Sequence, residues 1–209
     1  MRLTPRKPKL DALDIIGVTD EAGKPSRRVL GGRKAKTKGS SFERRVGKMF
    51  EPWWGSKFFR TPMSGGSQLK FDYNLAGDIC TPAEDFPFHV ECKNQEALGK
   101  FHNFLVSAKS AVWKWWKQST DECPADQIPI LVFTKNHAPI FVLMELDYYI
   151  ALSEQAPYKG EDFEFGSSVR TNGTVTITLN TFIAVCKEDH KNAAERYWEI
   201  KEEAASTSS

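Results

Sequence analysis

The chain has 209 residues, of which 40% are hydrophobic and 12% aromatic, enough for one good-sized core with additional tails. No run approaches 18 apolar residues, and no apolar stretch follows the basic start MRLTPRKPKL, so neither a membrane span nor a secretory signal is expected. The four cysteines form no C-x-x-C pair and are typical of a reduced protein of the cytoplasm; Cys80 and Cys92 fall in predicted strands as small buried hydrophobes.

Positive charge is concentrated at the N-terminal end. Residues 1–39 contain eleven Lys/Arg and four Asp/Glu, a net charge of +7, whereas residues 136–209 contain six and twelve, a net charge of −6. Basic arms commonly attract phosphate backbones, but a solvated tail without a ligand has the same composition. Because residues 1–38 contain few large apolar groups, we expect a basic and largely disordered arm there.

The folded body is predicted to begin with a helix at Ser40. Ser40 and Glu43 fit a capping box, an apolar stripe follows, and Pro52 indicates where the helix ends. A short strand is predicted at residues 57–61, followed by the loop PMSGGS and by a second strand that starts around Asp78.

Further strands and helices alternate along the rest of the chain. The segment FHVECKN is a strand, a helix is predicted within residues 101–120, and IPILVFT and PIFVLM are expected to form antiparallel neighbours in a buried sheet. TNGTVTITLN and FIAVC are predicted as strands, and NAAERYWEIKEEAA as a short terminal helix. This order indicates an α/β fold with a mixed central sheet flanked by helices. We expect the core at residues 39–150, with an acidic extension, residues 151–209, packed on it.

The predicted helix carries the sequence WKWWKQ, which interleaves Lys114 and Lys117 with three tryptophans. Such a surface can stack on nucleic-acid bases and contact phosphates. At helical spacing, Trp115 and Trp116 are more often contacts of the core or of a dimer. The sequence is compatible with both interpretations.

The strand FHVECKN raises the question of function. Its alternation places Glu91 and Lys93 side by side on one face, either as an ion pair on a solvated sheet or as part of a metal-dependent phosphodiesterase site. If the strand at Asp78 pairs with this one, Asp78 and Glu91 can converge, and the backbone carbonyl of Cys92 would complete an oxygen-rich metal site. Lys93 would then orient the attacking water.

Four motifs in order, KGSSFERRV, FFRTPMSGGS, AGDI and FHVECKN, resemble the PD-(D/E)xK nuclease superfamily, and in particular archaeal-type and phage-encoded Holliday junction resolvases. The resemblance covers residues 38–95 and extends to about residue 145. It implies a restriction-endonuclease-like core and a catalytic site built from Glu43, Asp78, Glu91 and Lys93. The chain departs from the pattern in having no proline before Asp78 and in its long acidic C-terminal part.

The resemblance also implies cofactors and DNA contacts. Mg²⁺, with Mn²⁺ as a substitute, would be held by Asp78, Glu91, the Cys92 carbonyl and Glu43. The residues expected to contact DNA are Lys38, Arg44, Arg60, Ser64, Gly65, Gly66 and Gln95. Ordinary explanations exist for them too: Glu43 as a capping residue, the arginines as surface charges, and MSGGS or Gln95 as turns.

The expected function is therefore that of a Mg²⁺-dependent, structure-selective DNA endonuclease that resolves four-way junctions as a homodimer. We expect it to act in a cytoplasm, which would be that of the host cell if the protein is phage-encoded. One alternative is another nuclease of the superfamily that acts on duplex or flap DNA in replication, repair or restriction. A second is a DNA-binding module without activity, but Asp78, Glu91 and Lys93 are all present.

Overall fold

The computed structural model describes residues 27–61, 77–95, 110–155, 169–171 and 173–207; for residues 27–36 and 169–171 only the backbone is described. The chain divides into two compact units, Met1–Lys38 and Gly39–Ser209. The described helices and strands, in chain order, are α1 (Arg27–Trp54), β1 (Phe59–Arg60), β2 (Ile79–Cys80), β3 (Phe88–Asn94), α3 (Ala111–Glu122), β4 (Ile128–Thr134), β5 (Phe141–Glu145), α4 (Leu146–Gln155), β6 (Val169–Thr171), β7 (Thr174–Thr178), α5 (Leu179–Ala184) and α6 (Lys187–Thr207). None of these helices is long and apolar enough to cross a lipid bilayer.

Helix α1 is longer than the sequence predicted. It begins at Arg27, so Ser40 lies inside the helix and the predicted capping box is wrong. The predicted end is confirmed, because α1 stops at Trp54, two residues after Pro52. Gly55 then adopts a φ of +73° and its N–H donates to the Glu51 carbonyl (2.9 Å), a C-terminal cap that favours glycine.

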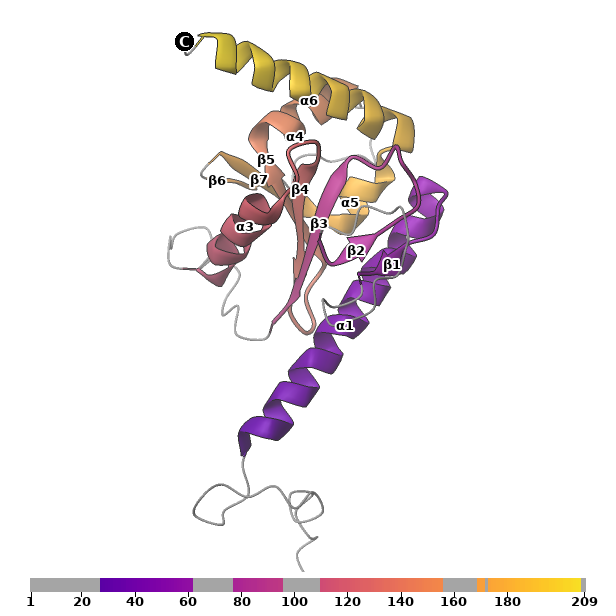
Figure 1. Cartoon of the computed structure of the whole chain (residues 1–209), viewed down its shortest axis with the longest axis vertical. Coiled ribbons are helices and arrows are strands. Elements are labelled where there is room, and N and C mark those ends of the chain that lie inside the picture. Colours follow the sequence, from indigo (N-terminus) through magenta and orange to yellow (C-terminus); the bar gives the residue numbers. More distant parts are fainter. Residues whose placement is uncertain (1–26, 62–76, 96–109, 156–168, 172, 208–209) are drawn as a thin grey trace, which may run out of the picture. The chain divides into compact units, whose positions relative to one another are not determined.

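The central sheet has five strands in the order β3-β4-β5-β7-β6 (Figure 1). Strands β3 and β4 are parallel, and all other pairs are antiparallel. The predicted α/β class with a mixed sheet and the predicted antiparallel pairing of β4 with β5 are therefore confirmed. Strand β3, which carries FHVECKN, lies at one edge of the sheet.

The strand predicted to start around Asp78 is β2, which begins at Ile79 and pairs with β1 in a separate two-stranded sheet, so the pairing with β3 that the sequence left open does not form. Two other local predictions are wrong. The apolar segment FIAVC is not a strand, because α5 covers its first three residues and is capped by Thr178, whose Oγ1 accepts a hydrogen bond from the Thr181 N–H (3.1 Å). The terminal helix, α6, extends over 21 residues rather than being short.

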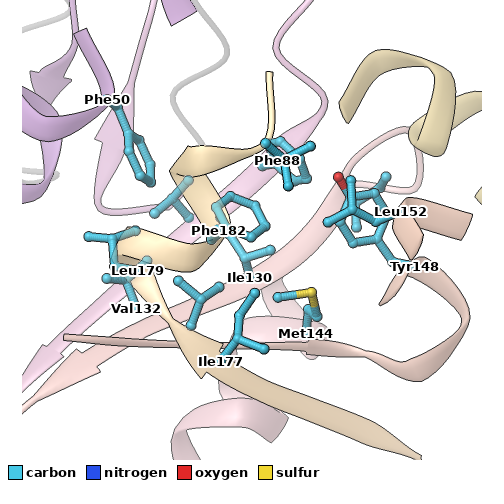
Figure 2. Packing of buried hydrophobic residues seen from close by; sticks show 14 of the residues in the cluster. Phe50, Phe88, Ile130, Val132, Met144, Tyr148, Leu152, Ile177, Leu179 and Phe182 are labelled. Atoms are coloured by element: carbon cyan, nitrogen blue, oxygen red, sulfur yellow. The ribbon is translucent and has the colours of Figure 1, made fainter. Parts of the chain in front are cut away.

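Alternate residues of β3 face two different hydrophobic clusters. Phe88, Val90 and Cys92 point into the larger one, which α1, α4, α5 and α6 cover and which Figure 2 shows in part. The smaller cluster lies under α3 and contains Val112, Leu131, Phe133 and Leu143. The odd-numbered side chains of β3, which include Glu91 and Lys93, therefore lie on the α3 side of the sheet.

Helix α3 begins at Ala111, where Ser110 caps it by accepting a hydrogen bond from the Val112 N–H (3.4 Å). Residues 101–109 of the predicted helix lie outside the described residues. The three tryptophans of α3 are partly buried and pack against the smaller cluster, which confirms that they serve the core. Lys114 and Lys117 are exposed on the same helix.

Candidate active site

Asp78 reaches β3 because the residue before it is glycine. Gly77 has a φ of +82°, and a Cβ there would lie 2.7 Å from the Val90 carbonyl oxygen. The absence of that Cβ lets the Asp78 N–H donate to the same carbonyl at 2.8 Å. The Asp78 carboxylate in turn accepts a hydrogen bond from the Cys92 N–H, with 2.8 Å between N and Oδ2. Asp78 is thus fixed beside the edge of β3 by its backbone and its side chain.

Glu91 and Lys93 form an ion pair on the α3 side of β3. Glu91 is only 4% exposed. Burial and the charge of Asp78 raise its pKa, against the lowering effect of Lys93. Burial opposes the charge of Lys93, but the hydrogen bond and the charge of Glu91 outweigh it, so the pKa of Lys93 lies above its ordinary value. Two carboxylates and one ammonium therefore share one small region.

Cys92 stands at the centre of this region. Its N–H points to Asp78, away from β4, and because the N–H and C=O of a strand residue point to the same side, its carbonyl faces that edge as well. Burial and then the negative charges of Asp78, Glu43 and Glu91 raise the pKa of its thiol. Cys80 is also buried, as predicted for both thiols.

Glu43, on α1, is bound by a residue of β1. The Arg60 side chain donates from Nε to Glu43 Oε2, with side-chain exposures of 29% for Arg60 and 12% for Glu43. The structure therefore joins two residues for which the sequence predicted separate roles, one toward metal and one toward DNA. Glu43 is neither a capping residue nor a solvated surface acid.

The donor set fits a hard divalent cation. Asp78, Glu91 and the Cys92 carbonyl supply oxygen, which Mg²⁺ and Mn²⁺ prefer. The two carboxylates also repel each other, as the effect of Asp78 on the pKa of Glu91 shows, and a cation between them relieves that repulsion. Among the described residues, no group of three or more His, Cys, Asp or Glu side chains is arranged to hold a metal, so the fit rests on two carboxylates and a carbonyl.

The residues expected to contact DNA belong to several different segments of the chain. Arg44 is exposed on α1, next to Glu43. Gln95 is exposed directly after β3, and its N–H donates to the Thr134 carbonyl (3.2 Å). Lys38 belongs to the unit Met1–Lys38 and is half-buried. The loop residues Ser64, Gly65 and Gly66 lie outside the described residues.

Sequence reasoning missed two groups near the site. His89 is 1% exposed, and neither ring nitrogen has a hydrogen-bond partner; burial lowers its pKa. The position of His89 could have been predicted from the sequence, because strand alternation places His89 on the same face as Glu91. Glu122, at the end of α3, adds negative charge that acts on both His89 and Glu91. No sequence signal indicates that contact, since it depends on how α3 packs on the sheet.

The family model described as "Phage putative PDDEXK endonuclease" matches residues 34–192, which include every residue of the region around Cys92. No curated protein and no solved structure matches the chain at a significant level.

Proposed function

The chain belongs to this phage PDDEXK endonuclease family and is thus a nuclease, and we propose that it is a Mg²⁺-dependent DNA endonuclease that cuts four-way junctions as a homodimer. The observation that carries the metal-dependent part of the proposal is the arrangement around Cys92. Asp78 is hydrogen-bonded to the strand that bears Glu91 and Lys93, which supports a single site for these three residues although Asp78 is distant from them along the chain.

Each residue has a distinct role in the proposed reaction. Asp78, Glu91 and the Cys92 carbonyl would hold the cation, which, when bound, supplies Lewis-acid chemistry by lowering the pKa of water and offsetting charge on the phosphate. Lys93, released from Glu91, positions the attacking water with its ammonium. Arg44 and Arg60 hold phosphates through their guanidinium groups, which suit that geometry.

Two considerations support a branched substrate and a dimer. The motifs around the site are similar to those of junction resolvases, and symmetric nicking of a four-way junction needs two sites related by a two-fold axis, which a homodimer supplies. The Lys/Arg excess of residues 1–39 suits a large polyanion. Cleavage of duplex or flap DNA is the alternative within the same family.

The test is cleavage of matched four-way, flap and linear DNAs of equal length by the full chain, with Mg²⁺, with Mn²⁺ or with chelator. We expect paired nicks at symmetric positions in the four-way junction, and none with chelator. Preferential cutting of flap or linear DNA would favour the alternative. Absence of cleavage of all three DNAs with either metal would contradict the proposal and favour an inactive binding module.

A further inference from the structure

The ion pair between Arg60 and Glu43 joins two different parts of the folded unit. Glu43 lies on α1 and Arg60 on β1, and both side chains are largely withdrawn from solvent. An Arg–carboxylate pair in such a setting strongly resists loss of one partner, because the remaining charge stays desolvated. Either residue can leave the pair readily only if another charge replaces its partner.

The surroundings indicate what could replace each partner. The negative charge of Glu43 acts on the Cys92 thiol together with those of Asp78 and Glu91, so Glu43 faces the carboxylate region. Yet in the described part of the chain these acids do not form a three-carboxylate metal cluster, and Glu43 is held by Arg60. A cation is the natural replacement for Arg60 beside Glu43, and a phosphate is the natural replacement for Glu43 beside Arg60.

We propose that Arg60 is a positioning residue that couples DNA binding to metal binding by exchanging Glu43 for a DNA phosphate. In the free protein Arg60 neutralises Glu43. When a phosphate takes the guanidinium, Glu43 is released to join Asp78 and Glu91 at the metal. The proposal deepens the proposed function and rests on it, since it needs both DNA and a divalent cation at this site.

Linkage makes the proposal quantitative. If DNA binding releases Glu43, DNA raises the affinity for metal, and metal must raise the affinity for DNA by the same factor, typically about 5- to 150-fold for coupled sites. A polyanion also raises metal affinity without any exchange, by concentrating cations near the protein. The experiment must therefore separate the Arg60-dependent part from this general effect.

The measurement is calorimetric titration of Ca²⁺ into the full chain, with and without a short four-way junction, and with gels to show that the DNA stays intact. Arg60→Ala, Glu43→Gln and the double variant are compared with wild type, and thermal unfolding confirms that each is folded. Arg45→Ala is the matched control, because it removes another exposed arginine of α1, two residues from Glu43, and leaves the pair.

We expect DNA to raise Ca²⁺ affinity at least about 5-fold more in wild type and Arg45→Ala than in Arg60→Ala. In Arg60→Ala, Glu43 has no competing cation, so Ca²⁺ should bind the free protein more tightly than it binds wild type. In Glu43→Gln, DNA should no longer raise Ca²⁺ affinity beyond the general polyanion effect. The double variant should show the same small enhancement as Glu43→Gln. The conservative variant Arg60→Lys should restore part of the coupling.

Two failures are distinguishable. If wild type binds DNA and Ca²⁺ but the enhancement in Arg60→Ala equals that in Arg45→Ala, the pair is only structural and the coupling is overturned. If the unaltered protein binds no DNA or no Ca²⁺, the proposed function is overturned and the coupling with it. An unfolded Arg60→Ala leaves the decision to Glu43→Gln, whose undiminished enhancement would equally overturn the coupling.

Discussion

The carboxylate of Asp78, the residue just before β2, accepts a hydrogen bond from the N–H of Cys92 in β3 at 2.8 Å. This bond holds Asp78 beside Glu91. In Asp78→Asn the amide oxygen can accept the same bond, so we expect the fold to remain while the ligand loses its charge. Cleavage should fall by at least about 10²-fold, as for other lost electrostatic groups.

Cleavage assays with Mg²⁺ test this prediction. Asp121→Asn is the matched control, because Asp121 is an exposed aspartate on α3. Cleavage that continues in chelator, or at the normal rate in Asp78→Asn, would contradict a carboxylate metal site.

Lys93→Ala separates folding from chemistry. Glu91 can take up a proton once Lys93 is lost, since its pKa is already raised, so we expect the fold and most DNA affinity to persist. Loss of the water-orienting charge should still lower single-turnover cleavage by on the order of 10²-fold or more. Lys114→Ala, at an exposed lysine of α3, should change little. Near-normal turnover in Lys93→Ala would mean that Glu91 and Lys93 form a structural ion pair and that Lys93 has no role in cleavage.

Gly77→Ala should damage the site through the backbone. A left-handed φ costs an alanine about 1–2 kcal/mol, and the added Cβ would also meet the Val90 carbonyl oxygen at 2.7 Å. Gly173→Ala is a close control, because Gly173 has a φ of +71° but nothing within 4 Å of the added Cβ. We expect Gly77→Ala to lower the free energy of unfolding more than Gly173→Ala, and only Gly77→Ala to lower cleavage. Equal effects of the two substitutions would contradict this.

His190 should make stability fall in acid. Its Nε2 donates to the Phe182 carbonyl (2.9 Å), and its Nδ1 lies 2.7 Å from the Tyr148 hydroxyl, from which the neutral ring can accept a hydrogen bond. Burial lowers its pKa to about 4 from 6.5. Between pH 4 and pH 6.5 the histidine is protonated in the unfolded chain but not in the folded protein. The contribution of the neutral ring to the free energy of unfolding is therefore fully present above pH 6.5 and is lost as the pH falls toward 4.

Between pH 7.5 and pH 5, His190 should lower the free energy of unfolding by about 2 kcal/mol. Urea unfolding at both pH values, in wild type and in His190→Gln, measures it as the difference in pH dependence. His137→Gln, at an exposed histidine, should keep the dependence of wild type. The same dependence in His190→Gln as in wild type would exclude His190 as the cause.

The positive charge of residues 1–39 lies mostly within α1. Residues 27–38 contain six Lys/Arg and no acid, whereas residues 1–26 contain five Lys/Arg and four acids, a net charge of +1. Deleting residues 1–26 should therefore change DNA binding little. Deleting residues 1–37 should weaken it and flatten the salt dependence by about 0.9 per lost phosphate contact. Equal salt slopes for the two deletions would mean that this basic segment does not contact DNA.

Strands with a clear signature and the antiparallel pairing of the consecutive strands β4 and β5 were predictable from sequence, but contacts between elements distant along the chain were not. The alternation in FHVECKN and the continuous apolar run IPILVFT specified β3 and β4 correctly. The apolar segment FIAVC is too short for its pattern to distinguish a strand from a helix. In the structure its first residues belong to α5, which Thr178 caps. Spacing suggested that Asp78 approaches Glu91, but the route through Gly77 and Cys92 depends on backbone geometry. The Glu43–Arg60 pair joins α1 to β1 and has no local signature.

The position of β3 at the sheet edge links the site to solubility. An edge strand exposes backbone N–H and C=O groups that can pair with another chain and start aggregation. Here Asp78 occupies that edge: its N–H bonds to the Val90 carbonyl and its carboxylate to the Cys92 N–H. Replacing Asp78 with a residue that cannot accept this bond would therefore leave Cys92 ready to pair with a strand of a neighbouring molecule. The residue proposed to hold metal would, on this account, also protect the protein from self-association.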